Sequence, residues 1–247
     1  MKKTIIITSF LMSFFSIFSQ NTSGRIVYKI EIVTNEKLLE ADKKFGIIAD
    51  AINASKSIEY NLDFNIKESI FYQVEDLKVN PLAANTVNSF CTPFDLIYNN
   101  VDFKEILCAK NSYNSLFGKN DFVIKIEPIL NWELTNETKY IDGFLCYKAK
   151  TLKTKKYLEK LYSEPVVAWY CPSLPYSFGP TQYSGLPGLI LEIQEEKVTI
   201  GLKSIDFKKL VNIVKPTAKR IISLDEFYKI TSEKIENMLQ MAKDNDK

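Results

Sequence analysis

The sequence predicts an α+β fold dominated by β-structure: a strongly curved antiparallel meander sheet, open and half-barrel-like, with one early helix and one C-terminal helix. Three observations lead to this prediction. Segments along most of the chain alternate apolar with polar residues, which is the pattern of strands that bury one face. Residues 35–55 instead carry apolar side chains three and four positions apart, which predicts an amphipathic helix. Residues 223–239 show the same spacing near the C-terminus.

The N-terminal residues 1–19 are typical of a secretory signal peptide. Two lysines precede a mostly apolar run, residues 5–18, and small and polar residues follow it. A membrane-spanning helix needs ~20 apolar residues and this run is shorter, so a retained membrane anchor is the less favoured alternative. With cleavage after Ser19, we expect one mature domain, residues 20–247, without a membrane span. We expect this domain in the periplasm, at the outer membrane or outside the cell.

The mature chain is predicted to begin with a strand at residues 26–33, where every second residue is apolar. The early helix follows and ends near Ser55. The clearest strand of the chain spans residues 58–66, and residues 70–74 return as the second strand of a hairpin. The apolar stripe of the early helix consists of Leu38, Ala41, Phe45, Ile48 and Ile52.

Residues 80–120 contain two prolines, many asparagines and two cysteines, and they predict an irregular excursion. The lysine-rich stretch between Ala149 and Val166 indicates the solvated face of a long hairpin, with a site for an acidic ligand as the alternative. Ser223 and Glu226 form a capping box that begins the C-terminal helix. Strand patterns return at residues 122–126, 132–134, 144–149, 166–170, 189–193 and 198–202.

The charge balance argues against nucleic-acid binding. The chain has 32 lysines and arginines and 30 aspartates and glutamates. Cleavage of the signal peptide would remove two of the lysines and leave a nearly neutral domain, whereas binding to phosphate backbones needs a strongly basic surface.

Residue types also restrict the chemistry. The chain contains no histidine, which excludes Ser-His and Cys-His nucleophiles and histidine metal sites. Ser184 precedes Gly185 but lacks the upstream glycine of a nucleophile elbow. Three glutamates are clustered, but two of them, Glu195 and Glu196, lie in a predicted exposed turn. We therefore predict a protein that is not an enzyme, with no catalytic residue, metal or cofactor.

The even number of cysteines predicts two disulfides in an exported protein. Sequence order suggests that Cys91 pairs with Cys108 and that Cys146 pairs with Cys171, one of three connectivities that four cysteines allow. Buried free thiols, which pack as small apolar side chains, are the alternative.

A tight turn is predicted at Leu186–Leu189. Pro187 fits the second position of a type II β-turn, Gly188 supplies the positive φ that the third position needs, and Gly185 precedes them. The aromatic and proline-rich loop before this turn is the predicted binding surface, with packing in the core as the alternative for each of its residues. Its binding residues are predicted to be Trp169, Tyr176, Phe178, Pro180, Tyr183 and Leu186.

Residues 185–190 read GLPGLI, and with their flanking residues they resemble the GLPGLI family of exported Bacteroidetes proteins. The resemblance covers about residues 126–193. It implies a location in the cell envelope and association with an outer-membrane transport protein, but no activity, because the family has no established catalytic residues. The chain departs from the family in its long hairpin after Ala149 and at Cys171, which weakens the pairing of Cys171 with Cys146. The flanking pattern consists of Trp132, Leu134, Ile141, Gly143, Phe144, Cys146, Lys148, Ala149, Ala168, Trp169, Tyr170, Gly179, Pro180 and Tyr183.

Three functions remain open on the sequence. The leading one is a non-catalytic envelope protein that binds an apolar ligand or a protein partner, and a deep apolar cavity would favour it. The second is a structural or assembly factor of an outer-membrane complex, which an exposed apolar patch at the Pro172–Gly188 edge would favour. The third is a hydrolase that works without histidine, which would need two carboxyl groups of raised pKa in a cleft.

Overall fold

The computed structural model describes residues 23–34, 40, 42–43, 46–76, 78–92, 94–109, 121–129, 131–157 and 160–245. The predicted signal peptide, residues 1–19, lies outside the described residues, as do Leu38, Ala41 and Phe45 of the predicted early helix. Within the described part of the chain, no helix has the length and apolar character that crossing a membrane requires.

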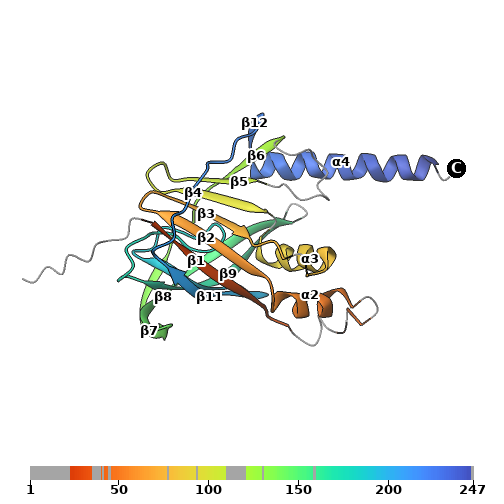
Figure 1. Ribbon diagram of the computed structural model, residues 1–247. Coiled ribbons are helices and arrows are strands. Elements are labelled where there is room, and N and C mark those ends of the chain that lie inside the picture. Colours follow the sequence, from red (N-terminus) through yellow and green to blue (C-terminus); the bar gives the residue numbers. More distant parts are fainter. Residues whose placement is uncertain are drawn as a thin grey trace, which may run out of the picture.

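Twelve strands form one sheet in the order β12-β6-β5-β4-β3-β2-β1-β11-β10-β9-β8-β7 (Figure 1). All neighbouring strands are antiparallel except β12 and β6, which are parallel. The strands are β1 (Ser23–Ile32), β2 (Glu59–Asn65), β3 (Glu68–Gln73), β4 (Leu96–Asn100), β5 (Glu105–Ala109), β6 (Phe122–Ile126), β7 (Glu133–Ile141), β8 (Phe144–Tyr157), β9 (Lys160–Cys171), β10 (Leu189–Gln194), β11 (Val198–Asp206) and β12 (Arg220–Ser223).

The β-dominated α+β class is confirmed, but the predicted strong curvature is wrong. The sheet is not curled into a half-barrel, and β7 and β12 are its two separate edges. Apolar clusters pack on both faces of the sheet. Curling the sheet around one cluster would open the packing of the clusters on the other face, so an open, twisted sheet is the arrangement that buries all of them.

The main core lies on one face and contains the apolar row that the sequence predicted for β1: Ile26, Tyr28, Ile30 and Ile32 are all buried. The row predicted for residues 58–66 joins it through Tyr60, Leu62 and Phe64 of β2. Tyr28 is fully buried, and its hydroxyl donates to the carbonyl oxygen of Ile190 at 2.6 Å. Residues 162 positions apart are thereby held together in the middle of the sheet.

Three helices are found among the described residues: α2 (Ile47–Ser55), α3 (Pro81–Cys91) and α4 (Leu224–Asn245). The predicted end of the early helix near Ser55 and the C-terminal helix are confirmed. Helices α2 and α3 lie side by side and contact β1, whereas α4 begins beside β12 and β6 and then extends away from the sheet (Figure 1).

The irregular excursion predicted for residues 80–120 is wrong for much of its length, since it contains α3, β4 and β5. Residues 110–120 lie outside the described residues. The Oδ1 of Asn80 accepts hydrogen bonds from the backbone N–H groups of Leu82 and Ala83, and Pro81 occupies the first turn. Asn80 and Pro81 therefore begin a helix here, because asparagine is favoured at the N-cap and proline at the first helical position.

The second face of the sheet carries two smaller clusters. Ala149, Val166, Ala168 and Tyr170 pack there with the loop 172–188. At the other end, a second small cluster on β4, β5 and β6 packs against residues of the 207–219 segment, which crosses the sheet from β11 to β12 (Figure 1). Residues of this second cluster are Tyr98, Leu107 and Val123, with Ile213 and Ala218 packed on them.

The predicted disulfides are not formed: the structure has Cys91, Cys108, Cys146 and Cys171 as buried free thiols. Burial raises the pKa of the Cys91 and Cys108 thiols and raises that of Cys146 to about 12. Cys146 interacts with Cys171 through the thiol groups, without a covalent bond. The alternative of thiols that pack as small apolar side chains is therefore the one that the structure adopts.

Candidate functional site

The predicted binding residues are divided between the two faces of the sheet. Tyr176 and Phe178 belong to the main core, where the Tyr176 ring meets Phe64 edge-on at 4.6 Å. Tyr183 and Leu186 pack in the cluster on the second face. Pro180 is buried and Trp169 is half-buried. This burial agrees with core packing, and a direct binding role for these six residues stays a prediction.

The GLPGLI segment forms a turn of another type than predicted. The N–H of Gly188 donates to the carbonyl of Leu186 at 2.8 Å, while that of Leu189 donates to Leu174. A hydrogen bond over two residues makes an inverse γ-turn at Pro187, not a type II β-turn. The N–H of Leu189 donates to the carbonyl of Leu174, so it does not form the hydrogen bond to Leu186 that would close a β-turn.

Glycines allow the loop to lie directly on the sheet. Gly188 has φ +149°, and a Cβ at this position would lie 2.3 Å from the carbonyl oxygen of Cys171. At Gly179, a Cβ would lie 2.7 Å from the Cβ of Ile190. Gly185 has φ +85°. The glycines of this segment thus serve close packing and backbone geometry.

A buried ion pair and a tyrosine fix the loop to the hairpin. Glu195 accepts two hydrogen bonds from Lys153, at 2.8 and 2.9 Å, and one from the Tyr183 hydroxyl at 2.7 Å. Its side chain is 6% exposed, so the prediction of an exposed turn is wrong for Glu195, although Glu196 is exposed. Burial, followed by the charge of Glu195, raises the pKa of Tyr183. No local pattern in the sequence links these three residues, because strand pairing alone brings them together.

The loop is also strained at one residue. Thr181 has φ +56°, which is rare for a β-branched side chain, and its buried hydroxyl has no hydrogen-bond partner. Nearby, the Trp132 indole N–H donates to the Ser184 carbonyl at 2.9 Å, and its ring meets Tyr183 edge-on. The surrounding packing holds the loop in a conformation that costs about 1–3 kcal/mol.

Trp169 lies between two lysines on the main-core face. The Nζ of Lys139 is 4.5 Å from the centre of its ring and the Nζ of Lys148 is 5.9 Å away. Lys139 pairs with Glu192 at 2.7 Å, and Lys148 pairs with Glu137, whose pKa it lowers. Each lysine therefore forms an ion pair with a carboxylate and a cation–π contact with the Trp169 ring.

Exposed apolar residues lie on β7 and β8 at the edge of the sheet and at the two ends of this loop. Tyr140 and Leu145 are cross-strand partners on β7 and β8, 73% and 38% exposed. Pro172 directly follows β9 and is exposed. Gly188 packs against the backbone of Cys171 and Pro172, and its neighbour Pro187 is exposed. We call Tyr140, Leu145, Pro172 and Pro187 the edge patch. It includes residues of the Pro172–Gly188 edge, where an exposed apolar patch was expected for a structural or assembly factor.

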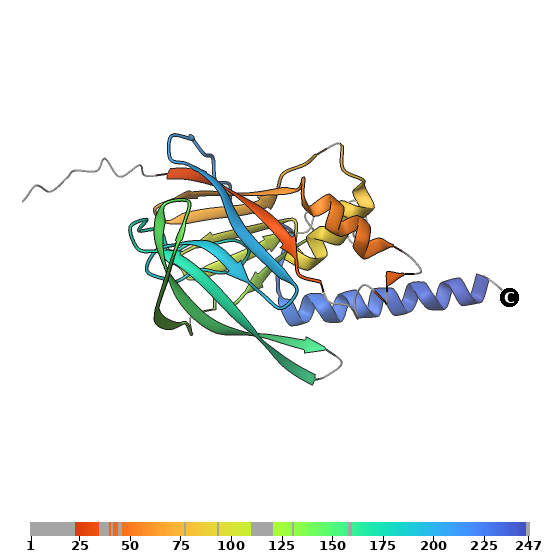
Figure 2. The same cartoon turned by 90° about the horizontal axis from the view of Figure 1, so that it is seen from below.

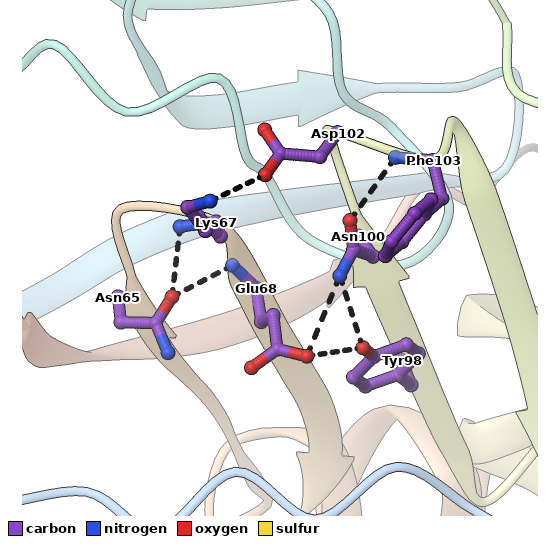
Figure 3. Close-up of polar contacts among 7 residues, drawn as sticks. All are labelled: Asn65, Lys67, Glu68, Tyr98, Asn100, Asp102 and Phe103. Atoms are coloured by element: carbon purple, nitrogen blue, oxygen red, sulfur yellow. Dashed lines mark hydrogen bonds and ion pairs between the residues drawn. The ribbon is translucent and has the colours of Figure 1, made fainter.

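A polar cluster occupies the second face between β3 and β4 (Figure 3). Glu68 accepts hydrogen bonds from Tyr98 and Asn100, and Asn100 also accepts from the backbone N–H of Phe103 at 3.2 Å. Burial and the contact with Glu68 raise the pKa of Tyr98 to about 12. Donors and acceptors satisfy one another within this cluster, so we assign it a structural role.

In the described part of the chain, no three His, Cys, Asp or Glu side chains are grouped closely enough to hold a metal ion. A cavity of about 380 Å³ opens between α2 and α3, away from the loop and the edge patch.

Comparison with known proteins gives a short family match and a similarity of fold. The model of a family described as a protein of unknown function (Porph_ging) matches residues 153–192, from β8 to β10. This segment contains the loop and the GLPGLI turn. No curated protein matches the chain.

Two solved structures of PNGF-II are similar to the chain. In the P21 crystal form, 86% of this chain aligns with 34% of PNGF-II at 13% identity and a TM-score of 0.50. In the C2 form, 81% of the chain aligns with 30% of PNGF-II at 14% identity and a TM-score of 0.45. The chain thus spans about a third of the length of PNGF-II, and at such identity the similarity concerns the fold alone.

Proposed function

We propose that this protein is a non-catalytic envelope protein that binds a protein partner through the edge patch. The observation that carries the proposal is the exposure of Tyr140 beside Leu145 at an open edge of the sheet. Tyrosine is one of the side chains that are enriched among the residues contributing most to protein interfaces.

The patch is supported by rigid structure. Tyr140 and Leu145 stand on paired strands, and two prolines restrict the backbone beside them. Leu186, which precedes Pro187, is buried in the same cluster as Tyr183, and the Tyr183 hydroxyl donates to Glu195. Binding to a surface that is already ordered loses little conformational entropy, which favours affinity.

The β7 edge offers a second means of contact. Every side chain of β7 is partly or fully exposed, and its pairing with β8 is irregular between Leu134 and Thr138. The regular part, from Thr138 to Ile141, leaves unpaired backbone groups next to Tyr140. An extended segment of the partner can add to this edge while its side chains contact the patch.

The location and the class of partner rest on the sequence. The signal-peptide pattern of residues 1–19 and the resemblance to the GLPGLI family support a place in the periplasm or at the outer membrane. They also support an outer-membrane transport protein as the partner. The family match over residues 153–192, which contains the GLPGLI turn, supports that resemblance. An assembly factor would use the same surface, and the identity of the partner distinguishes the two roles.

Photo-crosslinking tests the proposal. A photoreactive amino acid replaces Tyr140 in the native host, and a matched one replaces Tyr162, which is 48% exposed on the β8–β9 hairpin. We expect one discrete crosslinked protein from position 140 and none from position 162. The crosslinked protein, purified separately, must then bind the unmodified chain.

Equal crosslinking from both positions, or no partner that rebinds after purification, would contradict the proposal.

A further inference from the structure

A second surface lies between α2 and α3, separate from the edge patch. The two helices run side by side (Figure 1). The cavity between them measures about 380 Å³. Sites for small molecules measure about 300–1,000 Å³, so this cavity suits a ligand at the small end of that range. Its lining consists of Ile47, Asp50, Ala54, Ser57, Lys78, Val79, Asn80, Leu82, Ala83 and Thr86.

The cavity has apolar walls that are not covered by other described residues. Ile47 contributes from α2 and Leu82 from α3, and these side chains are 42% and 64% exposed. Two alanines, Ala54 and Ala83, leave the space between the helices open. An aliphatic group placed in the cavity would remove both large side chains from water, which stabilises the complex.

Two opposite charges line the same cavity without neutralising each other. Neither the carboxylate of Asp50 nor the ammonium group of Lys78 forms an ion pair with a described residue. In contrast, the polar groups of Asn80 and Thr86 are engaged in α3, by capping its first turn and by bonding to Leu82. Asp50 and Lys78 are thus the charged groups left to a ligand.

We propose that this cavity binds a small zwitterion with an aliphatic body, of the size of an amino acid or a dipeptide. Its ammonium group pairs with Asp50, its carboxylate pairs with Lys78, and its aliphatic side chain packs between Ile47 and Leu82. Both charges and the apolar walls are needed, because ion pairs at exposed sites contribute only about 0–1 kcal/mol each.

Ligand-detected and protein-detected NMR titrations test this site on the full mature chain. The probes are leucine and the dipeptide Leu-Leu, with N-acetyl-leucine, leucinamide and glycine as matched compounds that lack the ammonium group, the carboxylate and the aliphatic body. We expect leucine or Leu-Leu to shift resonances of α2 and α3. We expect each matched compound to bind up to about fivefold more weakly, which corresponds to about 1 kcal/mol.

Charge variants assign the two ends of the ligand. Lys78→Met is expected to weaken leucine binding up to about fivefold and to leave leucinamide binding unchanged. Asp50→Asn is expected to weaken leucine binding to the same extent and to leave the binding of N-acetyl-leucine, which has no ammonium group, unchanged. Glu75→Gln and Lys56→Met change exposed charges outside the cavity and serve as controls.

Absence of any shift at 10 mM probe, about the weakest binding that such a titration measures, would overturn the proposal. Binding that both cavity variants leave unchanged would overturn it equally. All four variants replace exposed side chains, so a folded spectrum is expected for each.

Discussion

At the scale of single residues, the GLPGLI segment acts through its backbone. Gly188 lies against the carbonyl of Cys171 with no space for a Cβ, and Pro187 forms the γ-turn before it. The sequence correctly indicated that a glycine with positive φ was needed at position 188. It did not indicate the turn type, because that depends on the bond from Leu189 to Leu174, a contact with a residue 15 positions earlier.

The first prediction concerns this glycine. Gly188→Ala is expected to lower the free energy of unfolding by about 2–4 kcal/mol, since the new Cβ meets backbone atoms and φ is unfavourable. Gly201→Ala is the matched control, because a Cβ there meets nothing within 4 Å. Urea denaturation measures both. Equal stability of the two variants would show that the loop does not lie on the strand as described.

The second prediction concerns the buried ion pair. Lys153→Met leaves the Glu195 carboxylate buried with Tyr183 as its one remaining side-chain partner among the described residues, and is expected to cost about 1–3 kcal/mol of stability. Lys43→Met removes an exposed pair with Glu40 and is expected to cost less than about 0.5 kcal/mol. Thermal and urea unfolding compare the two. A loss no greater in Lys153→Met than in the control would contradict the buried contact.

At the scale of elements, apolar periodicity predicted the strands well where one face is buried. The apolar rows of β1 and β2 were predicted correctly. On β2, however, the polar residues Asn61 and Asp63 of the other face are buried as well. Apolar periodicity did not identify α3, because this helix contains several asparagines and few large apolar residues, a composition that is common in loops. Its N-cap, Asn80, and the following proline were the signals that could have identified it.

The third prediction separates the two halves of α4. Phe227, in the first turns, belongs to the main core, whereas Ile235, Met238 and Met241 are exposed where the helix extends past the sheet (Figure 2). Truncation after Lys234 is expected to change the free energy of unfolding by less than about 1 kcal/mol. Phe227→Ala should cost about 3 kcal/mol.

A truncated chain that unfolds as readily as Phe227→Ala would mean that the distal half of α4 is part of the fold. Chemical denaturation followed by circular dichroism makes the comparison.

At the scale of the whole molecule, packing on both faces explains what the sequence could not show. The apolar residues of each face were visible as alternating rows, but the division of the loop between two clusters was not. Tyr176 and Tyr183 come from one short loop, yet they are buried in different clusters. The sequence did not identify Tyr140 as a residue of the edge patch, because Tyr140 lies beside Leu145 only through the pairing of β7 with β8.

The fourth prediction is a loss of stability at alkaline pH. Burial raises the pKa of Cys91 and Cys108 above the ordinary value of 9.0 and that of Tyr28 and Tyr183 above 10.0. Each group stays protonated in the folded state while it ionises in the unfolded state. The contribution of the cysteines is therefore complete below about pH 9 and that of the tyrosines below about pH 10, and each is lost above that pH by about 1.4 kcal/mol per pH unit and group.

Urea denaturation between pH 8 and about 11.5 measures this slope. Tyr183→Phe removes one such group and should make the decline between pH 10 and 11.5 shallower by about one proton. Tyr140→Phe, at an exposed side chain, is the control. A stability that does not change over this range would contradict the burial of these groups.

The most direct test of the account is the affinity of the purified partner for an edge-patch variant. Tyr140→Ser with Leu145→Ser is expected to weaken binding at least about 30-fold, as for loss of an interface hot spot, while the fold stays intact. The matched variant, Leu152→Ser with Tyr162→Ser, changes residues of the neighbouring β8–β9 hairpin that are 62% and 48% exposed, and should bind as the natural chain does. If instead the edge-patch variant binds its partner with unchanged affinity, the edge patch is not the binding surface.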